Sequence, residues 1–225
     1  MENASKALLM AGSILISLVI IGALIFMFRN ITGYQKTAGT VTEEKQIAEF
    51  NKEYTSFEKN LYGSELLSLI NKAVDYNTKN TADGYTPITI TLEVKNGTGS
   101  NNASSLVKAG TYSINSKTSN VISSNLLVEI EDIKTKYGGD KYLQRLVSLN
   151  NSAKTAEIET LLKELNSTYT YASCRNDIVK YTEYMEFKRK KFKFKQTLFD
   201  GEQAGASATT SNGRIVEMKY EEITS

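Results

Sequence analysis

The chain of 225 residues contains no histidine and no tryptophan, and it has one cysteine and one proline. Histidine is the commonest general base and a frequent metal ligand, so its absence removes the usual catalytic triads and imidazole metal sites. The single cysteine, Cys174, excludes an intrachain disulfide and a sulfur-rich zinc site within one chain. We therefore expect no enzyme activity, no metal and no cofactor, with a carboxylate-only hydrolase as the remaining catalytic alternative.

The chain also lacks a large excess of charge of either sign. It has 27 Lys and Arg residues against 25 Asp and Glu residues, a formal net charge of +2. A balance of this kind gives no reason to expect a nucleic-acid partner. The polar part is rich in Asn, Ser, Thr, Lys and Tyr, which favours an extended hydrogen-bonding surface over a tight apolar pocket.

The longest uncharged segment runs from Ala7 to Phe28, 22 residues bounded by Lys6 and Arg29. At about 1.5 Å per residue a helix of this length would measure ~33 Å, enough to cross the hydrocarbon core of a bilayer. A cleaved signal peptide has a shorter apolar region and a small-x-small site after it, and neither feature is present. The sequence predicts a short tail over residues 1–6 and a single transmembrane helix over residues 7–28 that contacts membrane lipid.

The charges beside this segment give little information about orientation. Lys6 precedes it, while Arg29 and Lys36 follow it closely, so the positive charges are nearly balanced. A short tail followed at once by an anchor favours export of the remainder, and we expect a single-pass protein with its C-terminal domain outside the cytoplasm. Gly33 and Gly39 weaken any continuing helix, so residues 29–39 are predicted to be a linker.

A helical hairpin is predicted over residues 40–80. Thr40 and Glu43 have the spacing of a capping box, and an apolar stripe follows at helical spacing. Such a stripe either packs on the core of the domain or binds a second copy of the chain. Ser64 starts a second helix with its own apolar face, and Asp83-Gly84 marks a turn. The stripe consists of Ile47, Phe50, Tyr54, Phe57 and Leu61, and the face of the second helix of Leu66, Leu69, Ile70, Ala73 and Val74.

Residues 86–225 mix strand and helix signals. Alternation of apolar and polar residues predicts strands over 86–95, 126–133 and 214–223, with strand-like spacing near Tyr169 and Tyr171 and a short strand near Tyr112. Helical spacing is present over 140–149 and 154–166, and Gly-rich or polar loops are predicted over 96–105 and 200–213. The domain over residues 40–225 is therefore predicted to be α+β, a helical hairpin followed by an antiparallel sheet with additional helices.

Basic residues cluster late in the chain and form a candidate patch for an anionic partner. Alternation predicts that the lysines of a strand from Phe187 onward share one face, with a bulge near residues 188–190. Two interpretations are open: a surface that attracts an anionic envelope polymer, or a solvated strand face whose lysines pair with Glu217 and Glu221. The patch consists of Lys188, Arg189, Lys190, Lys191, Lys193 and Lys195.

Two resemblances bear on function. The stretch EFNKEYTSFEKNLYGSELLSLINKAVDYN, with the start MENASKALLMAGSILI and the ending FKFKQ…NGRIVEMKYEEI, resembles uncharacterised membrane-anchored proteins of low-GC Gram-positive bacteria. That resemblance implies an anchor and a bacterial source but no activity. The order of anchor, helix and antiparallel strands resembles type IV pilin-like proteins. The chain departs from them in lacking a basic leader that ends in glycine, an acidic residue inside the apolar run, and a C-terminal cysteine pair.

From these observations we expect a structural or pilin-like surface protein that acts through protein–protein contacts, including contacts between its own copies. The alternative is a monomeric tethered domain that binds envelope polymers or small ligands. Oligomerisation through the anchor and the Ile47–Leu61 stripe separates the two hypotheses.

Overall fold

The computed structural model describes residues 21, 23–25, 27, 44–80, 86–98, 105–200 and 213–224. The chain divides into two compact units, Met1–Phe50 and Asn51–Ser225, which are considered separately below. In the first unit, residues 21, 23–25, 27 and 44–50 are helical. Most of the predicted anchor, the whole linker and the Thr40 cap lie outside the described residues. Among those that are described, no helix has the length and apolar character needed to cross a membrane.

The second unit is built on a five-stranded sheet with the order β1-β4-β5-β2-β3. The β2 and β5 strands pair in parallel, whereas the other neighbouring strands pair antiparallel. The α+β class is thus confirmed, and the expectation of a purely antiparallel sheet is wrong. Most of the unit's helices lie between β2 and β5 in sequence, and a long helical connection allows two strands to run in the same direction. The strands are β1 Leu61–Tyr62, β2 Thr89–Val94, β3 Gly110–Ile114, β4 Lys191–Phe199 and β5 Ile215–Glu222.

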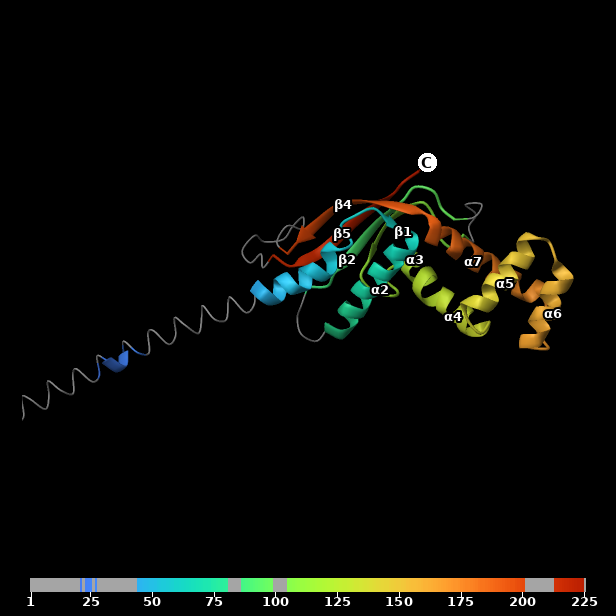
Figure 1. The fold of residues 1–225 in the computed structure, drawn as a ribbon, viewed down its shortest axis with the longest axis horizontal. Coiled ribbons are helices and arrows are strands. Elements are labelled where there is room, and N and C mark those ends of the chain that lie inside the picture. The colour runs from blue at the N-terminus through green and yellow to red at the C-terminus, as the bar shows by residue number, and fades with distance from the viewer. Residues whose placement is uncertain are drawn as a thin grey trace, which may run out of the picture. The chain divides into compact units, whose positions relative to one another are not determined.

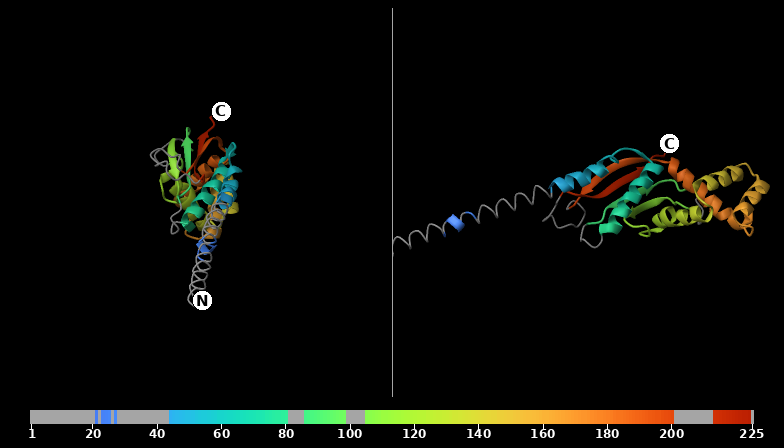
Figure 2. Two further views of the ribbon diagram at one scale, coloured as in Figure 1. Left: turned by 90° about the vertical axis from the view of Figure 1, so that its left-hand side faces the viewer. Right: turned by 60° about the horizontal axis from the view of Figure 1, so that its bottom comes forward.

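The helices of this unit fall into two groups. One helix, α2 (Gly63–Asn80), packs against β2 and β4 of the sheet (Figures 1 and 2). The others form a chain of helices in which α3 begins beside the sheet and α5 and α6 lie at the end away from it, and α7 runs from that end back to the sheet and leads directly into β4 (Figure 1). They are α3 Val121–Ser123, the π-helix η2 Ser124–Glu129, α4 Ile130–Lys136, α5 Asp140–Asn151, α6 Thr155–Leu165 and α7 Tyr171–Arg189.

The core lies between α2 and the inner face of the sheet. All five apolar residues predicted for the face of α2 are buried, as are the predicted inward residues of β2 and β5. This confirms the period-two interpretation of both strands and the helical interpretation of α2. The buried set comprises Leu66, Leu69, Ile70, Ala73 and Val74 of α2, Ile88 beside β2, Ile90, Leu92 and Val94 within it, and Val216, Met218 and Tyr220 of β5.

Gly63 allows the beginning of α2 to cross the end of α7 closely. A Cβ atom at this position would lie 2.0 Å from the carbonyl oxygen of Phe187, closer than any side chain can approach. The amide of Gly63 donates a hydrogen bond to the carbonyl oxygen of Lys190 at 2.8 Å. Only glycine fits here without moving backbone, so this residue fixes the crossing of α2 and α7.

The predicted helical hairpin is shorter than expected in its first half. The helix over residues 44–55 ends before Phe57, and Leu61 belongs to β1, where it pairs with Phe192. The apolar stripe is therefore not continuous on one helix, and the prediction that its five residues share one helical face is wrong. The backbone turns over residues 56–60 because the amides of Phe57 and Glu58 bond to the carbonyls of Tyr54 and Thr55.

Residues 126–133, predicted as a strand, are helical. Asn120 begins this segment, since its side chain accepts from the Ser123 amide while Ser123 Oγ accepts from the Asn120 amide. This capping box satisfies two backbone donors and starts a helix. The apolar residues of the segment also recur at steps of one, three and three, which fits a helix once it has started. They are Leu126, Leu127, Ile130 and Ile133, and all four are buried.

The strand predicted near Tyr169 and Tyr171 is wrong for the same reason. Thr170 and Ser173 form a capping box, and α7 begins at Tyr171. That helix continues to Arg189, so the strand expected from Phe187 onward begins only at Lys191, and the bulge expected near residues 188–190 is also wrong. Register shifts do occur in β4, but they lie between Phe194 and Gln196 and between Leu198 and Phe199. Leu165, the last residue of α6, is 37% exposed.

Candidate functional site

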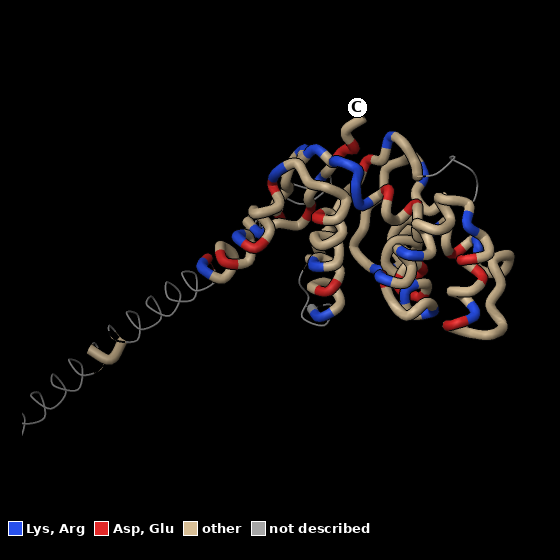
Figure 3. Tube along the Cα trace, turned by 45° about the vertical axis from the view of Figure 1, so that its right-hand side comes forward, with Lys and Arg blue, Asp and Glu red and all other residues tan. Residues whose placement is uncertain are grey.

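The predicted basic patch is divided between two elements. Lys188 and Arg189 end α7, Lys190 follows it, and the remaining lysines lie on β4. Figure 3 shows that basic and acidic positions are interspersed along most of the described tube. The patch is therefore a helix end followed by a strand and not one strand face.

Most cations of the patch have partners within the unit. Lys190 pairs with Glu222 and Lys195 with Glu221. Lys188 lies over the ring of Tyr184 and Lys191 over the ring of Tyr62, at 5.5 Å from each ring centroid. Arg189 and Lys193 are the two members for which the described part of the chain supplies no partner. The predicted pairing with Glu221 is present for Lys195, whereas Glu217 bonds to Lys219 and Thr91 instead.

The outer face of the sheet, opposite α2, carries polar side chains in transverse rows. One row reads Lys193, Glu221, Glu93 and Thr111 across β4, β5, β2 and β3. The next row reads Gln196, Lys219, Thr91 and Ser113. The first row thus has a lysine, two neighbouring carboxylates and a hydroxyl, and the second has an amide, a lysine and two hydroxyls. We call this surface, formed by these eight residues with Lys95, Lys195 and Glu217, the polar sheet face.

Glu221 is the electrostatic centre of the polar sheet face. Lys195 on β4 and Lys95 beside β2 both bond to its carboxylate. These two hydrogen-bonded cations lower the pKa of Glu221 to about 2. The same contact raises the pKa of Lys95. The sequence analysis predicted the partner on β4 but missed Lys95, because the parallel pairing that brings β2 beside β5 was not expected.

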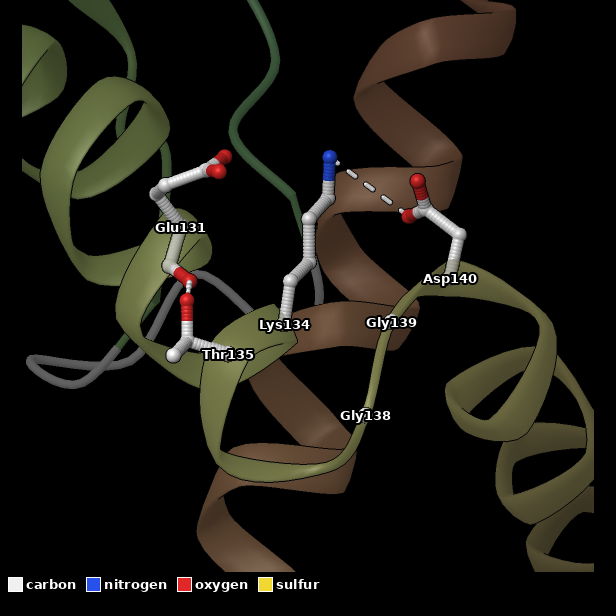
Figure 4. A pocket seen from close by; sticks show the side chains of 6 residues that line it. All are labelled: Glu131, Lys134, Thr135, Gly138, Gly139 and Asp140. Atoms are coloured by element: carbon white, nitrogen blue, oxygen red, sulfur yellow. Dashed lines mark hydrogen bonds and ion pairs between the residues drawn. The ribbon is translucent and has the colours of Figure 1, made fainter.

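A hollow of about 340 Å³ opens at the turn between α4 and α5 (Figure 4). The turn is made by Gly138 and Gly139, with φ of 71° and 107°, values that favour glycine. In Figure 4 the side chain of Lys134 stands between those of Glu131 and Asp140. The hollow is lined by Glu131, Lys134, Thr135, Gly138, Gly139 and Asp140. The Gly-Gly pair is the sequence signal that could have located it.

Two charged residues of this hollow, Lys134 and Asp140, contact tyrosines of α7. Asp140 Oδ1 accepts a hydrogen bond from the hydroxyl of Tyr181 at 2.6 Å and lies 3.5 Å from Lys134 Nζ. Burial raises the pKa of Asp140, but the Tyr181 hydroxyl and Lys134 outweigh it, so the net pKa is lowered. Lys134 Nζ also lies 5.1 Å from the ring centroid of Tyr184. This arrangement suits a small polar ligand better than an apolar one.

Glu183 is a buried carboxylate that the sequence analysis missed. Its Oε2 accepts hydrogen bonds from Thr98 Oγ1 at 3.1 Å and from the Leu106 amide at 2.6 Å. Thr98 lies within the polar loop predicted over residues 96–105 and Leu106 directly follows it, so Glu183 joins the two described ends of this region to α7. No local sequence pattern distinguishes this glutamate from Glu186, the exposed glutamate on the same helix.

Cys174 is 1% exposed on α7, which agrees with its interpretation as a small buried apolar residue. Its Sγ lies 3.6 Å from Ser173 Oγ, and that hydroxyl is already used in the capping box of α7. Across the described ranges, no group of three or more acidic or cysteine side chains is arranged to hold a metal ion.

The predicted self-association stripe falls in both units. Tyr54 and Leu61 are each 1% exposed in the core of the second unit, and Phe57 is half-buried there. Ile47 and Phe50 belong to the first unit and are half-buried. Within the second unit, the structure thus uses the stripe for internal packing.

No protein-family model matches this chain, and the searches of curated proteins and of solved structures likewise found no match.

Proposed function

We propose that this chain is a membrane-anchored protein whose folded unit, beginning at Asn51, lies outside the cytoplasm and works through protein–protein contacts. The observation that carries the anchor is the exposure of apolar side chains in the run from Ala7 to Phe28. Its described members are helical, and Ile21, Leu24, Ile25 and Met27 are 52%, 50%, 56% and 63% exposed. Exposed apolar surface costs about 25 cal/mol per Å² in water, and lipid removes that cost.

The packing of the second unit indicates that the apolar run is a membrane tether rather than a helix of the domain core. Its core contains residues from α2, α7 and the inner face of the sheet, and among the residues that the structure describes, the buried apolar side chains come from positions 54 onward. A domain with its own core does not require the apolar run for folding. The run therefore remains available for lipid.

The polar sheet face supports contact with proteins. It combines hydroxyl, amide and oppositely charged groups over neighbouring strands, which is the composition of a reversible, partly wet interface. The layout of anchor, helix and sheet is similar to that of pilin-like surface proteins, and we propose a structural or assembly role of that general kind.

Crosslinking of the full chain in native membranes tests the protein-contact role. An amine-reactive crosslinker should give a ladder of oligomers or a defined heteromeric band, whereas a monomer band alone would contradict the proposal. Protease added to intact spheroplasts tests the orientation, since an outside domain is digested before lysis. Full protection until lysis would place the domain in the cytoplasm.

The hollow at Gly138–Gly139 favours a second candidate function, a tethered domain that binds a small polar ligand or an envelope polymer. Lys134 offers an ammonium group, Thr135 a hydroxyl, and Glu131 and Asp140 carboxylates to such a ligand. Substitution of Lys134 by Met should then weaken ligand binding without changing the crosslinking pattern, which separates this function from the first.

A further inference from the structure

We propose that β3 is a docking edge at which a second copy of this chain adds its own β3 antiparallel, joining two sheets into one. This inference rests on the proposed role in protein–protein contacts and names the partner and the surface. It starts from the position of β3, which is the last strand of the sheet and pairs only with β2 among the described strands.

Backbone groups of Thr111 and Ser113 face this edge. The carbonyl oxygen of Ser113 accepts a hydrogen bond at 2.8 Å from the side chain of Asn120, which lies outside the β2–β3 ladder. The backbone N–H and C=O groups of successive residues point alternately to the two sides of an antiparallel strand. The backbone groups of Thr111 therefore point outward like those of Ser113, and the backbone groups of Tyr112 point toward β2. The edge therefore presents the outward amides of both residues and the Thr111 carbonyl to another extended strand, and the Ser113 carbonyl joins them when the Asn120 side chain releases it.

The edge lacks the features that usually prevent such pairing. Natural proteins protect edge strands with charged residues, proline, bulges or very short length. The opposite edge, β1, has two residues, but β3 has five and reads GTYSI, without charge or proline. Its register with β2 is regular over all five positions.

A two-fold register centred on Tyr112 makes the edge complementary to itself. Tyr112 then faces Tyr112 of the second copy, Thr111 faces Ser113, and Gly110 faces Ile114. Thr–Ser pairs are favourable across strands, and the same type of contact already exists inside the sheet, where Thr91 Oγ1 lies 3.2 Å from Ser113 Oγ. Gly110 leaves room opposite the larger Ile114.

The polar sheet face is also compatible with this register. The row that ends in Glu93 and Thr111 would continue into Ser113, Thr91 and Lys219 of the second copy. The nearest charged groups of this row on the two sides of the junction, Glu93 and Lys219 of the second copy, then have opposite signs, and three hydroxyl residues lie between them. Within this row no like charges face each other across the junction, which favours a second copy as the partner.

Disulfide trapping of the full chain in native membranes tests the register. In a Cys174→Ser background, Tyr112→Cys should form a disulfide-linked dimer under mild oxidation. Facing residues of a non-hydrogen-bonded pair have Cα atoms about 4.5 Å apart, within the range that a disulfide spans. Lys117→Cys, exposed in the turn after β3, is the matched control and should remain monomeric.

A second pair of variants tests the edge itself. Thr111→Pro removes an outward N–H and should abolish the Tyr112→Cys disulfide while leaving circular dichroism and melting unchanged. Thr111→Val keeps the N–H and should retain the disulfide. If Thr111→Pro fails to fold, mixed membranes carrying Thr111→Cys on one tagged chain and Ser113→Cys on another provide the alternative. That mixture should give the heterodimer in excess of either homodimer.

Either of two results would overturn the β3 edge as the contact. One is the absence of both the Tyr112→Cys disulfide and the mixed Thr111→Cys/Ser113→Cys disulfide. The other is a Tyr112→Cys disulfide that persists in Thr111→Pro. An amine-crosslinked ladder in the same membranes would then show that copies meet elsewhere, so the proposed function would stand without this surface. A monomer band with both reagents would contradict the proposed function as well.

Discussion

Lys190 and Glu222 form an ion pair that joins the α7–β4 junction to the end of β5. The side chains are 17% and 4% exposed, so both charges are largely removed from water. Glu222 Oε2 also accepts hydrogen bonds from the amides of Lys95 and Asn96, each at 2.9 Å. Lys190 Nζ in turn donates to the carbonyl of Asn96 at 2.6 Å. One carboxylate thus connects three segments that are far apart in sequence.

Glu222→Ala should therefore lower the free energy of unfolding by about 3–5 kcal/mol, since it removes the counter-charge of a largely buried ammonium and the acceptor of two amides. Glu222→Gln retains an acceptor and should cost less. Denaturant unfolding monitored by circular dichroism measures both. Glu93→Ala, on an exposed carboxylate of β2, is the control and should stay within about 0.5 kcal/mol of wild type. A Glu222→Ala variant as stable as this control would contradict the role of the pair.

Glu221 should make the stability of the protein sensitive to acid. Its pKa is about 2 in the folded state, below the ordinary value of 4.5, because Lys195 and Lys95 bond to the carboxylate. A lowered folded pKa contributes stability above the unfolded pKa, and this contribution is lost as the pH falls from about 5 toward 2. The denaturation midpoint of wild type should drop over that range more steeply than that of Glu221→Gln. Parallel curves for the two proteins would show that these contacts do not hold in solution.

Gly63→Ala should be strongly destabilising, by about 1–3 kcal/mol or more, because the added methyl group meets the Phe187 carbonyl at 2.0 Å. Ser64→Ala, at the next and exposed position of α2, is the matched control and should be nearly neutral. Thermal melting of both variants measures the difference. Equal melting temperatures would mean that α2 and α7 do not cross as described.

The basic run is expected to be a solvated surface and not a polymer-binding one. Arg189→Gln with Lys193→Gln removes the two cations that have no partner within the described residues, and leaves the ion pairs of Lys190 and Lys195 intact. Binding of the full chain, in detergent, to poly(glycerol phosphate) should not differ from that of Lys108→Gln with Lys117→Gln. A salt-sensitive loss confined to the first double variant would instead identify this run as a binding surface.

The parts of the fold that could be predicted from sequence are those where one local pattern dominates. The alternation in β2 and β5 and the helical spacing in α2 each place one face in the core, and burial of Ile90, Met218 and Leu69 follows directly. The segment over residues 126–133 carries apolar residues that fit either period. The Asn120–Ser123 capping box starts a helix before this segment, and the apolar pattern alone does not reveal that cap.

The polar sheet face could be predicted only in part, because the residues that contact each other on it come from distant segments of the sequence. The pairing of Lys195 with Glu221 follows from two neighbouring strands of a hairpin, and it was predicted. The contact of Lys95 with the same carboxylate requires β2 to lie parallel to β5, more than a hundred residues away. The Gly138–Gly139 hollow likewise depends on how α4, α5 and α7 pack, which local spacing does not fix.

Alkaline carbonate extraction of membranes that contain the full chain tests the anchor most directly. The wild-type protein should stay in the membrane pellet. Leu18→Lys with Ile21→Lys should release it, because each lysine near the centre of a spanning helix costs about 2.5–3.5 kcal/mol. Thr37→Lys with Ala38→Lys, which adds the same charge to the predicted linker, should leave the protein in the pellet. Release of the wild-type protein into the supernatant would contradict the membrane anchor.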